Sequence, residues 1–122
     1  MDIAGFKKLQ IWQKAMTLSA DIYETTKKIP EIERYGIISQ MRRCAVSVPS
    51  NIAEGYGRYS DNELVHFLKI ARGSLYELIT QASLCLTLGY IGAEDLSRIE
   101  RQTEEIDRMT IAFINKMNGM YK

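Results

Sequence analysis

The sequence predicts an all-α protein with the architecture of an antiparallel, up-down-up-down four-helix bundle. Apolar residues recur at spacings of three and four in four long segments, which is the periodicity of a buried helical stripe. Glycine or proline marks the ends of these segments. The connections between them are short, so consecutive helices are expected to pack side by side in opposite directions.

The size and composition of the chain fit one globular domain spanning residues 1–122. Apolar residues make up 46% of the sequence and charged residues 25%, enough for a hydrophobic core under an ordinary charged surface. No apolar run approaches the roughly 18 residues that a membrane-spanning helix needs, and the first residues lack the apolar core of a signal peptide. We therefore expect a cytoplasmic protein that does not contact a membrane.

The first helix is predicted over residues 8–28, and Pro30 stops it. Its core stripe follows the four-three spacing of a packed seam. This stripe consists of Ile11, Ala15, Leu18, Ile22 and Thr25. A second stripe of Trp12, Met16 and Tyr23 makes the apolar face wider than one seam requires. Because contiguous exposed apolar surface usually marks an interface, we expect this second stripe to join copies of the chain in a homo-oligomer.

The second helix is predicted from residue 35 to residue 55 or 56, where Gly55 and Gly57 stop it. Its core stripe consists of Ile37, Met41, Cys44 and Val48. A polar stripe runs beside it and contains Gln40, Arg43, Ser47, Ser50, Asn51 and Glu54. Pro49 lies inside the helix and removes the hydrogen bond to the Ala45 carbonyl, so we expect a kink near Ala45.

The third helix is expected to begin after a capping box, in which the Ser60 hydroxyl accepts from the Glu63 amide, and to end at Gly89. Its buried stripe consists of Leu64, Leu68, Ala71, Leu75, Leu78, Ala82 and Cys85. Gly73, in the middle of this helix, costs about 1 kcal/mol of helix propensity and is tolerated best where another backbone comes close. The fourth helix is predicted over residues 93–118. Its seam consists of Leu96, Ile99, Thr103, Ile106, Thr110, Phe113 and Met117.

Reactive side chains are few. Cys44 and Cys85 fall on apolar stripes, which favours buried, reduced thiols over a disulfide or a metal pair. His66 is the single histidine, and no nucleophile elbow, P-loop or HExxH motif is present. Glu54 and Glu77 are interpreted as partners of arginines rather than as paired catalytic acids. We expect no enzyme activity, no cofactor, no metal and no small-molecule substrate.

Three strings of residues carry a resemblance to a known family. The first contains Phe6, Leu9, Trp12, Gln13 and Ala15; the second comprises Tyr35-Gly36 and the run from Ser39 to Gly55; the third contains Ala71, Gly73, Ser74 and Glu77. Over about residues 6–115, the chain resembles the four-helix bundle protein family encoded by intervening sequences within 23S rRNA genes. The resemblance implies a bacterial bundle that assembles into a ring, as a homopentamer. This family is related to the accessory variability proteins of diversity-generating retroelements, which bind nucleic acid and a reverse transcriptase.

The polar stripe of the second helix, together with Glu77 of the third, has two interpretations. Arginine, serine and asparagine side chains can contact phosphate. The same residues can instead form a structural polar network that fixes the register of the bundle. The carboxylates favour the structural interpretation, because acids repel phosphate. From the position of the intervening loop, we predict that Arg43 lies opposite Ser74 and pairs with Glu77.

The basic residues of the first half are the candidate nucleic-acid contacts. The net charge is only +1, but residues 1–60 hold nine Lys and Arg against six Asp and Glu, a local balance of +3. The candidates are Lys7, Lys8, Lys14, Lys27, Lys28, Arg42 and Arg58. A mixed, solvated surface is the alternative. Tyr56 and Tyr59, beside Arg58, can stack on unpaired bases or simply close the end of the bundle.

The predicted function is therefore that of a non-enzymatic, oligomeric helical protein. It is expected to bind structured RNA, or a complex of RNA with a reverse-transcriptase-like protein, through a basic surface. The alternative is a protein-protein interaction scaffold without nucleic-acid contact.

Overall fold

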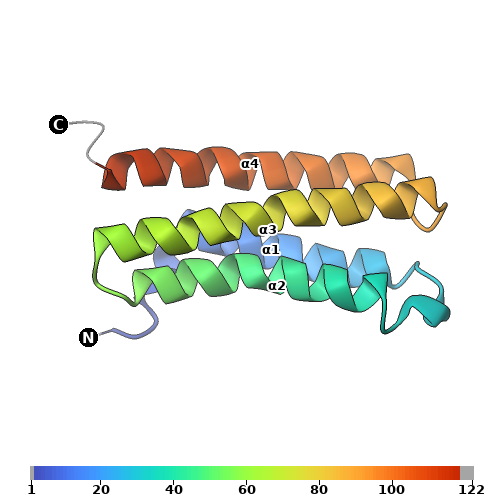
Figure 1. Ribbon diagram of the computed structural model, residues 1–122, viewed down its shortest axis with the longest axis horizontal. Coiled ribbons are helices and arrows are strands. Elements are labelled where there is room, and N and C mark those ends of the chain that lie inside the picture. The colour runs from blue at the N-terminus through green and yellow to red at the C-terminus, as the bar shows by residue number, and fades with distance from the viewer. Residues whose placement is uncertain (1, 119–122) are drawn as a thin grey trace.

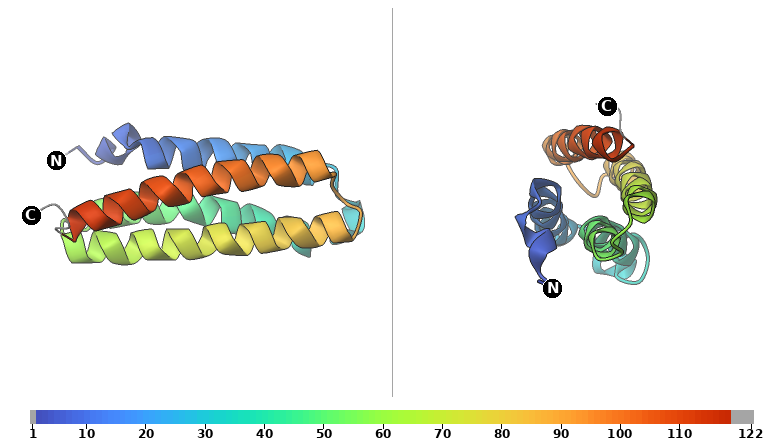
Figure 2. Two further views of the ribbon diagram at one scale, coloured as in Figure 1. Left: turned by 90° about the horizontal axis from the view of Figure 1, so that it is seen from above. Right: turned by 90° about the vertical axis from the view of Figure 1, so that its left-hand side faces the viewer.

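Four α-helices form an antiparallel bundle in the computed structural model, which describes residues 2–118. They are α1 (Gln10–Thr26), α2 (Ile37–Tyr56), α3 (Asp61–Thr87) and α4 (Ala93–Met117). Figure 1 shows the helices running alternately in opposite directions, and the end-on view in Figure 2 shows them in sequence order around a common core. This arrangement confirms the predicted all-α up-down bundle. No helix within residues 2–118 combines the length and apolarity needed to cross a membrane.

The core is built from the stripes that the sequence predicts. Every predicted core position of α1 and α3 is buried. In α2 the buried set includes Met41, Cys44 and Val48, whereas Ile37 is only partly covered. In α4 the last buried position is Ile114 instead of Phe113, which packs at the edge of the core. Periodicity therefore located the core well, because helix geometry fixes which side chains share a face.

The helix ends also follow local signals. The Ser60 hydroxyl accepts from the Glu63 amide at 3.4 Å and caps α3. Gly89 has a φ of +76°, and the amide of the next residue, Tyr90, donates to the Cys85 carbonyl, as in a Schellman motif. The first helix begins later than predicted, because residues 5–8 form the 3₁₀ helix η1 (Gly5–Lys8). A second 3₁₀ helix, η2 (Glu31–Glu33), precedes α2.

Pro49 lies inside α2, which continues through it as one helix. Because proline lacks an N–H, the Ala45 carbonyl loses its intrahelical donor. The hydroxyl of Ser19, a buried residue of α1, lies 2.9 Å from this carbonyl oxygen and also 2.9 Å from the Ala15 oxygen. A side chain of the neighbouring helix thus satisfies the acceptor that proline leaves open.

The contact between α2 and α3 is the most extensive in the bundle. Gly55 permits the close approach, since a Cβ there would lie 2.8 Å from the Cβ of Phe67. Gly73 does not lie close to another backbone, unlike the position that the sequence favoured for it. It is exposed, and a Cβ added to it would meet no atom within 4 Å among the described residues. Within one chain, therefore, no packing reason accounts for this glycine.

A cluster of ion pairs joins α1 to α4. The Asp95 carboxylate, only 6% exposed, accepts from Lys28 at 2.8 Å and from the Gly92 amide at 3.0 Å. Arg98 donates to Asp95 at 3.2 Å and to Asp21 of α1 at 2.9 Å. The hydrogen bond from Lys28 is the main cause that lowers the pKa of the Asp95 carboxyl below its ordinary value. Lys28 therefore serves as a structural link between the first and fourth helices.

Candidate functional site

The polar stripe of α2 lines an open groove of about 330 Å³ against α3. The side chains along the groove are those of Gln40, Arg43, Cys44, Ser47, Glu77 and Gln81. The hydroxyls of Ser47 and Ser74 lie 2.6 Å apart across the helix contact, and the Asn51 amide donates to the Ser47 carbonyl at 2.7 Å. The groove thus brings together polar residues of both helices, and Ser74 lies opposite Ser47 instead of opposite Arg43 as predicted.

Cys44 lies at the α2–α3 contact as a free, buried thiol. Its Sγ donates to the Ser74 carbonyl at 3.0 Å and lies 3.9 Å from Glu77 Oε2. Burial, followed by the repulsion of the Glu77 carboxylate, raises the pKa of the thiol to about 11. Cys44 is therefore protonated and weakly nucleophilic at neutral pH. Cys85 is also free and buried, which confirms the expectation of two reduced thiols.

The predicted direct pair between Arg43 and Glu77 is wrong. No ion pair joins them among residues 2–118, and both side chains are exposed. The observed contacts place Ser47 opposite Ser74 and Cys44 beside Glu77, about one helical turn from the predicted register. Cys44 is the residue that faces α3, so its neighbour Arg43 is rotated by about 100° toward solvent.

The remaining members of the predicted polar network lie apart from the Ser47–Ser74 contact. Ser50 is exposed, and Glu54 forms an ion pair at 2.9 Å with Arg58, one turn along the same helix end. Gln40 lines the groove without a hydrogen bond to the other members within residues 2–118. The network role proposed for all seven residues stays a prediction, with contacts observed for only part of the set.

The predicted basic residues do not share one surface. Lys7 and Lys8 lie in η1, whereas Lys27 and Lys28 lie past the other end of α1, whose 17 residues span about 25 Å. Four of the seven candidates are paired with carboxylates within 3.1 Å. These are Lys14 with Glu105, Lys27 with Glu24, Lys28 with Asp95, and Arg58 with Glu54. Such pairing reduces the charge that these residues present to a polyanion.

Arg42 is held by its own neighbours. Its Nε donates to the Thr26 hydroxyl at 2.9 Å, and its guanidinium lies 4.7 Å from the centre of the Tyr23 ring. No carboxylate pairs with Arg42, Lys7 or Lys8 within residues 2–118. Of the predicted contacts, Lys7 and Lys8 are thus the exposed cations that form no ion pair within residues 2–118.

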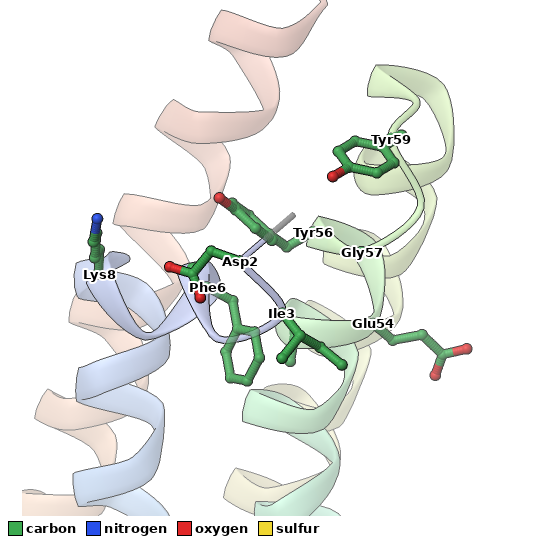
Figure 3. A pocket seen from close by; sticks show the side chains of 10 residues that line it. Asp2, Ile3, Phe6, Lys8, Glu54, Tyr56, Gly57 and Tyr59 are labelled. Carbon is green, nitrogen blue, oxygen red and sulfur yellow. The ribbon is translucent and has the colours of Figure 1, made fainter.

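A larger pocket, of about 740 Å³, lies at the end of the bundle that carries these lysines. It is open to solvent and is lined by the N-terminal segment on one side and by the end of α2 and the following loop on the other. Figure 3 shows Asp2, Phe6 and Lys8 extending from the N-terminal segment and Tyr56 and Tyr59 from the second side. The pocket therefore combines aromatic surface with charged groups of both signs.

The three residues of the predicted oligomer stripe, Trp12, Met16 and Tyr23, differ in how far they are exposed. Trp12 is partly buried against the core and lies edge-on to Phe6, with ring centroids 5.3 Å apart. Met16 and Tyr23 are exposed by 45% and 44%. Apolar residues of α3 are exposed to a similar or greater extent, including Tyr76 at 57% and Leu84 at 49%. The available interface surface thus extends beyond α1.

Comparison with known families identifies the group to which this bundle belongs. A family model described as 23S rRNA-intervening sequence protein matches residues 7–112, most of the chain. The chain belongs to this family. No curated protein matches it in sequence. Its fold is similar to the crystal structure of a protein with unknown function from the S23 ribosomal protein family of Bacteroides thetaiotaomicron, with a TM-score of 0.76 and 22% identity over 85% of this chain and 97% of that chain.

Two polar residues of this 23S rRNA-intervening sequence family member escaped the sequence interpretation. Gln81 lines the groove, and its buried Oε1 has no hydrogen-bond partner within residues 2–118. Asp95 anchors the α1–α4 ion pairs and was not among the residues that the sequence singled out. Neither role could be read from periodicity, because both depend on which atoms of another helix lie opposite.

Proposed function

We propose that this family member is a non-enzymatic, homo-oligomeric helical protein that binds structured RNA, free or within a ribonucleoprotein, through a basic surface. The observation that carries the proposal is the pair Lys7 and Lys8. Both are exposed, neither is paired with a carboxylate within residues 2–118, and Lys8 lines the 740 Å³ aromatic pocket. Cations without acidic partners are the groups best able to neutralise phosphates and release counterions.

Assembly would multiply this contact. A single chain has a net charge of only +1, which gives little long-range attraction for a polyanion. Copies arranged around a symmetry axis would repeat the lysine pair, and repeated weak contacts gain effective concentration on a long RNA. The resemblance to ring-forming relatives, among them the accessory variability proteins, supports a pentamer and a nucleoprotein partner. The family's name, which refers to 23S rRNA, supports RNA as the polyanion.

The test is the binding of a labelled structured RNA, followed by fluorescence anisotropy as salt rises from about 50 to 200 mM. Binding is expected to weaken with salt, and the Lys7→Gln/Lys8→Gln variant is expected to bind more weakly. Each lost phosphate contact should lower the log–log salt slope by about 0.7–0.9. Lys27→Gln is the matched control, because Lys27 is exposed but already paired with Glu24 at 2.9 Å.

A protein-protein scaffold is the competing function. It is favoured by the carboxylate partners found for four of the seven predicted basic residues. If the wild-type oligomer does not bind RNA even at the lowest salt, the scaffold interpretation replaces the proposal. If the double lysine variant and Lys27→Gln bind alike, the RNA surface lies elsewhere on the bundle.

A further inference from the structure

Tyr59, in the loop between α2 and α3, has an unusual backbone conformation. Its φ is +58°, in the left-handed region, and it is the only non-glycine residue within residues 2–118 with a positive φ. This region is strained for a bulky side chain, and glycine or asparagine normally occupies such positions. The tyrosine is 72% exposed and makes no side-chain hydrogen bond within the described part of the chain. No side-chain hydrogen bond within residues 2–118 therefore offsets this strain.

The exposed ring of Tyr59 belongs to the wall of the 740 Å³ pocket. Tyr56, Phe6 and Ile3 contribute further apolar surface, and Figure 3 shows the two tyrosines on the same side of the opening. The volume falls in the range of about 300–1,000 Å³ that is typical of small-molecule pockets. An aromatic ring held outward beside such a pocket is suited to stack on a planar ligand.

The charges at the pocket narrow the chemistry of that ligand. Lys8 has no carboxylate partner within residues 2–118 and can take a phosphate, while the Asp2 carboxylate extends from the same N-terminal segment. Asp2 Oδ1 accepts from the Ala4 amide at 3.0 Å, which leaves the other oxygen available as an acceptor. A carboxylate repels phosphate but accepts hydrogen bonds from amino groups. Glu54 also lines the pocket, but its carboxylate is paired with Arg58 at 2.9 Å. The pocket thus offers a stacking surface, a cation and an acceptor together.

We propose that this pocket binds one unpaired base of RNA, with the base stacked on Tyr59, its phosphate near Lys8 and its amino group at Asp2. The inference rests on the proposed RNA-binding function and adds a site and a base preference to it. Adenine, cytosine and guanine carry an exocyclic amino group that can donate to Asp2, whereas uracil has none and presents a single N3–H between two carbonyl oxygens that the carboxylate repels. Oligo(A) should accordingly bind more tightly than oligo(U).

The experiment compares the affinities of the full-length protein for labelled oligo(A) and oligo(U) of equal length at fixed low salt. Tyr59→Gly removes the ring and relieves the positive φ, so it should keep or raise the melting temperature while weakening oligo(A) binding about 5- to 150-fold. Tyr59→Phe keeps the ring and should bind as the wild type does. Asp2→Ala should bring the affinities for the two oligonucleotides closer together.

Trp12 provides a second readout that is specific to this end of the bundle. It is the only tryptophan, and its edge-on neighbour Phe6 lines the pocket. Adenosine monophosphate should change the fluorescence of Trp12 more than uridine monophosphate does. The tryptophan is excited at the red edge of its absorption band. Equal binding of oligo(A) and oligo(U), or unchanged affinity in Tyr59→Gly, would overturn the base pocket while leaving lysine-dependent RNA binding intact. No binding of either oligonucleotide would overturn the pocket, and the proposed function would fall with it only if the structured RNA also fails to bind at low salt.

Discussion

At the scale of single residues, Ser19 shows how one hydroxyl can complete a neighbouring helix. Proline at position 49 leaves the Ala45 carbonyl of α2 without its usual donor, and the Ser19 hydroxyl of α1 lies 2.9 Å from that oxygen. The interaction is buried, where an unsatisfied acceptor is costly. The position of α1 against α2 is thus fixed in part by a hydrogen bond that depends on proline.

We expect Ser19→Ala to destabilise the bundle by about 1–3 kcal/mol, because the buried Ala45 carbonyl loses its donor. In a Pro49→Ala background the same change should cost less, since the backbone amide introduced by that substitution can then donate to Ala45 within the helix. Urea unfolding of the two single variants and the double variant forms a thermodynamic cycle that isolates this coupling. Additive effects of the two changes would contradict the role assigned to Ser19.

At the scale of helices, two glycines have opposite surroundings. Gly55 lies where α2 meets α3, and a Cβ there would lie 2.8 Å from the Phe67 Cβ and 3.1 Å from a methyl group of Leu64. Gly73, in the exposed middle of α3, has no neighbour within 4 Å of an added Cβ among the described residues. The first glycine sets the distance between two helices, and the second only weakens one of them.

Gly55→Ala should destabilise the bundle by about 1–3 kcal/mol through overpacking. Gly73→Ala should stabilise it by about 0.5–1 kcal/mol, because alanine restricts the unfolded chain and favours the helix. Thermal or urea unfolding of both variants under identical conditions measures these two opposite changes in stability. A Gly73→Ala variant that loses stability or changes mass would show that another copy of the chain approaches this glycine.

The contact between α1 and α4 depends on the ionised Asp95 carboxylate. Its pKa in the folded state is lowered, chiefly by Lys28 and also by the Gly92 amide and Arg98. A group with a depressed folded pKa stabilises the fold above its unfolded pKa, near 3.8, and this contribution is lost as the pH falls through the lower folded value. Acid should therefore weaken the α1–α4 contact as the Asp95 carboxylate becomes protonated.

We expect Asp95→Asn to lower the free energy of unfolding at pH 7 by about 1.5–3 kcal/mol, because hydrogen bonds to charged groups are lost. The difference from the wild type should shrink as the pH falls from about 3.8 through the lower folded pKa of Asp95, and it should stay small below that value, where the carboxyl is protonated in both states. Urea unfolding across a pH series measures this. Glu24→Gln, which removes an exposed i,i+3 ion pair, is the control and should have little effect at any pH.

At the scale of the whole molecule, the exposed apolar side chains favour association. Met16 and Tyr23 of α1, and Tyr76 and Leu84 of α3, are each more than 40% exposed. Trp12 is a less suitable test of an interface, because it packs against Phe6 and the core of its own chain. Met16 is better suited, since its replacement leaves the buried stripe of α1 intact.

We expect the protein to be a homo-oligomer at micromolar concentration, measured as a mass by light scattering. Met16→Glu should raise the dissociation constant by about tenfold or more, if the side chain is an interface anchor. Thr17→Glu, an exposed position one residue along the same helix, is the matched control and should leave the mass unchanged. A monomeric wild-type mass would end the proposal of an assembled ring.

The sequence by itself determined the helices and the core. The stripes of α1 and α3, the Ser60 cap and the Gly89 stop were all predicted correctly, because they depend on backbone geometry and on neighbours within about four residues. The basic and aromatic candidates could be named from composition. Their partners could not, since salt bridges such as Lys28 with Asp95 join residues 67 positions apart.

Only the tertiary structure decided which candidates are available for binding. A one-turn difference in the α2–α3 register turned Arg43 away from the predicted pair with Glu77 and placed Cys44 there. The fold of the N-terminal segment against the end of α2 created the pocket beside Tyr59, with Lys8 at its edge. Register and approach distance follow from the fit of side chains between helices, which no spacing along one chain contains.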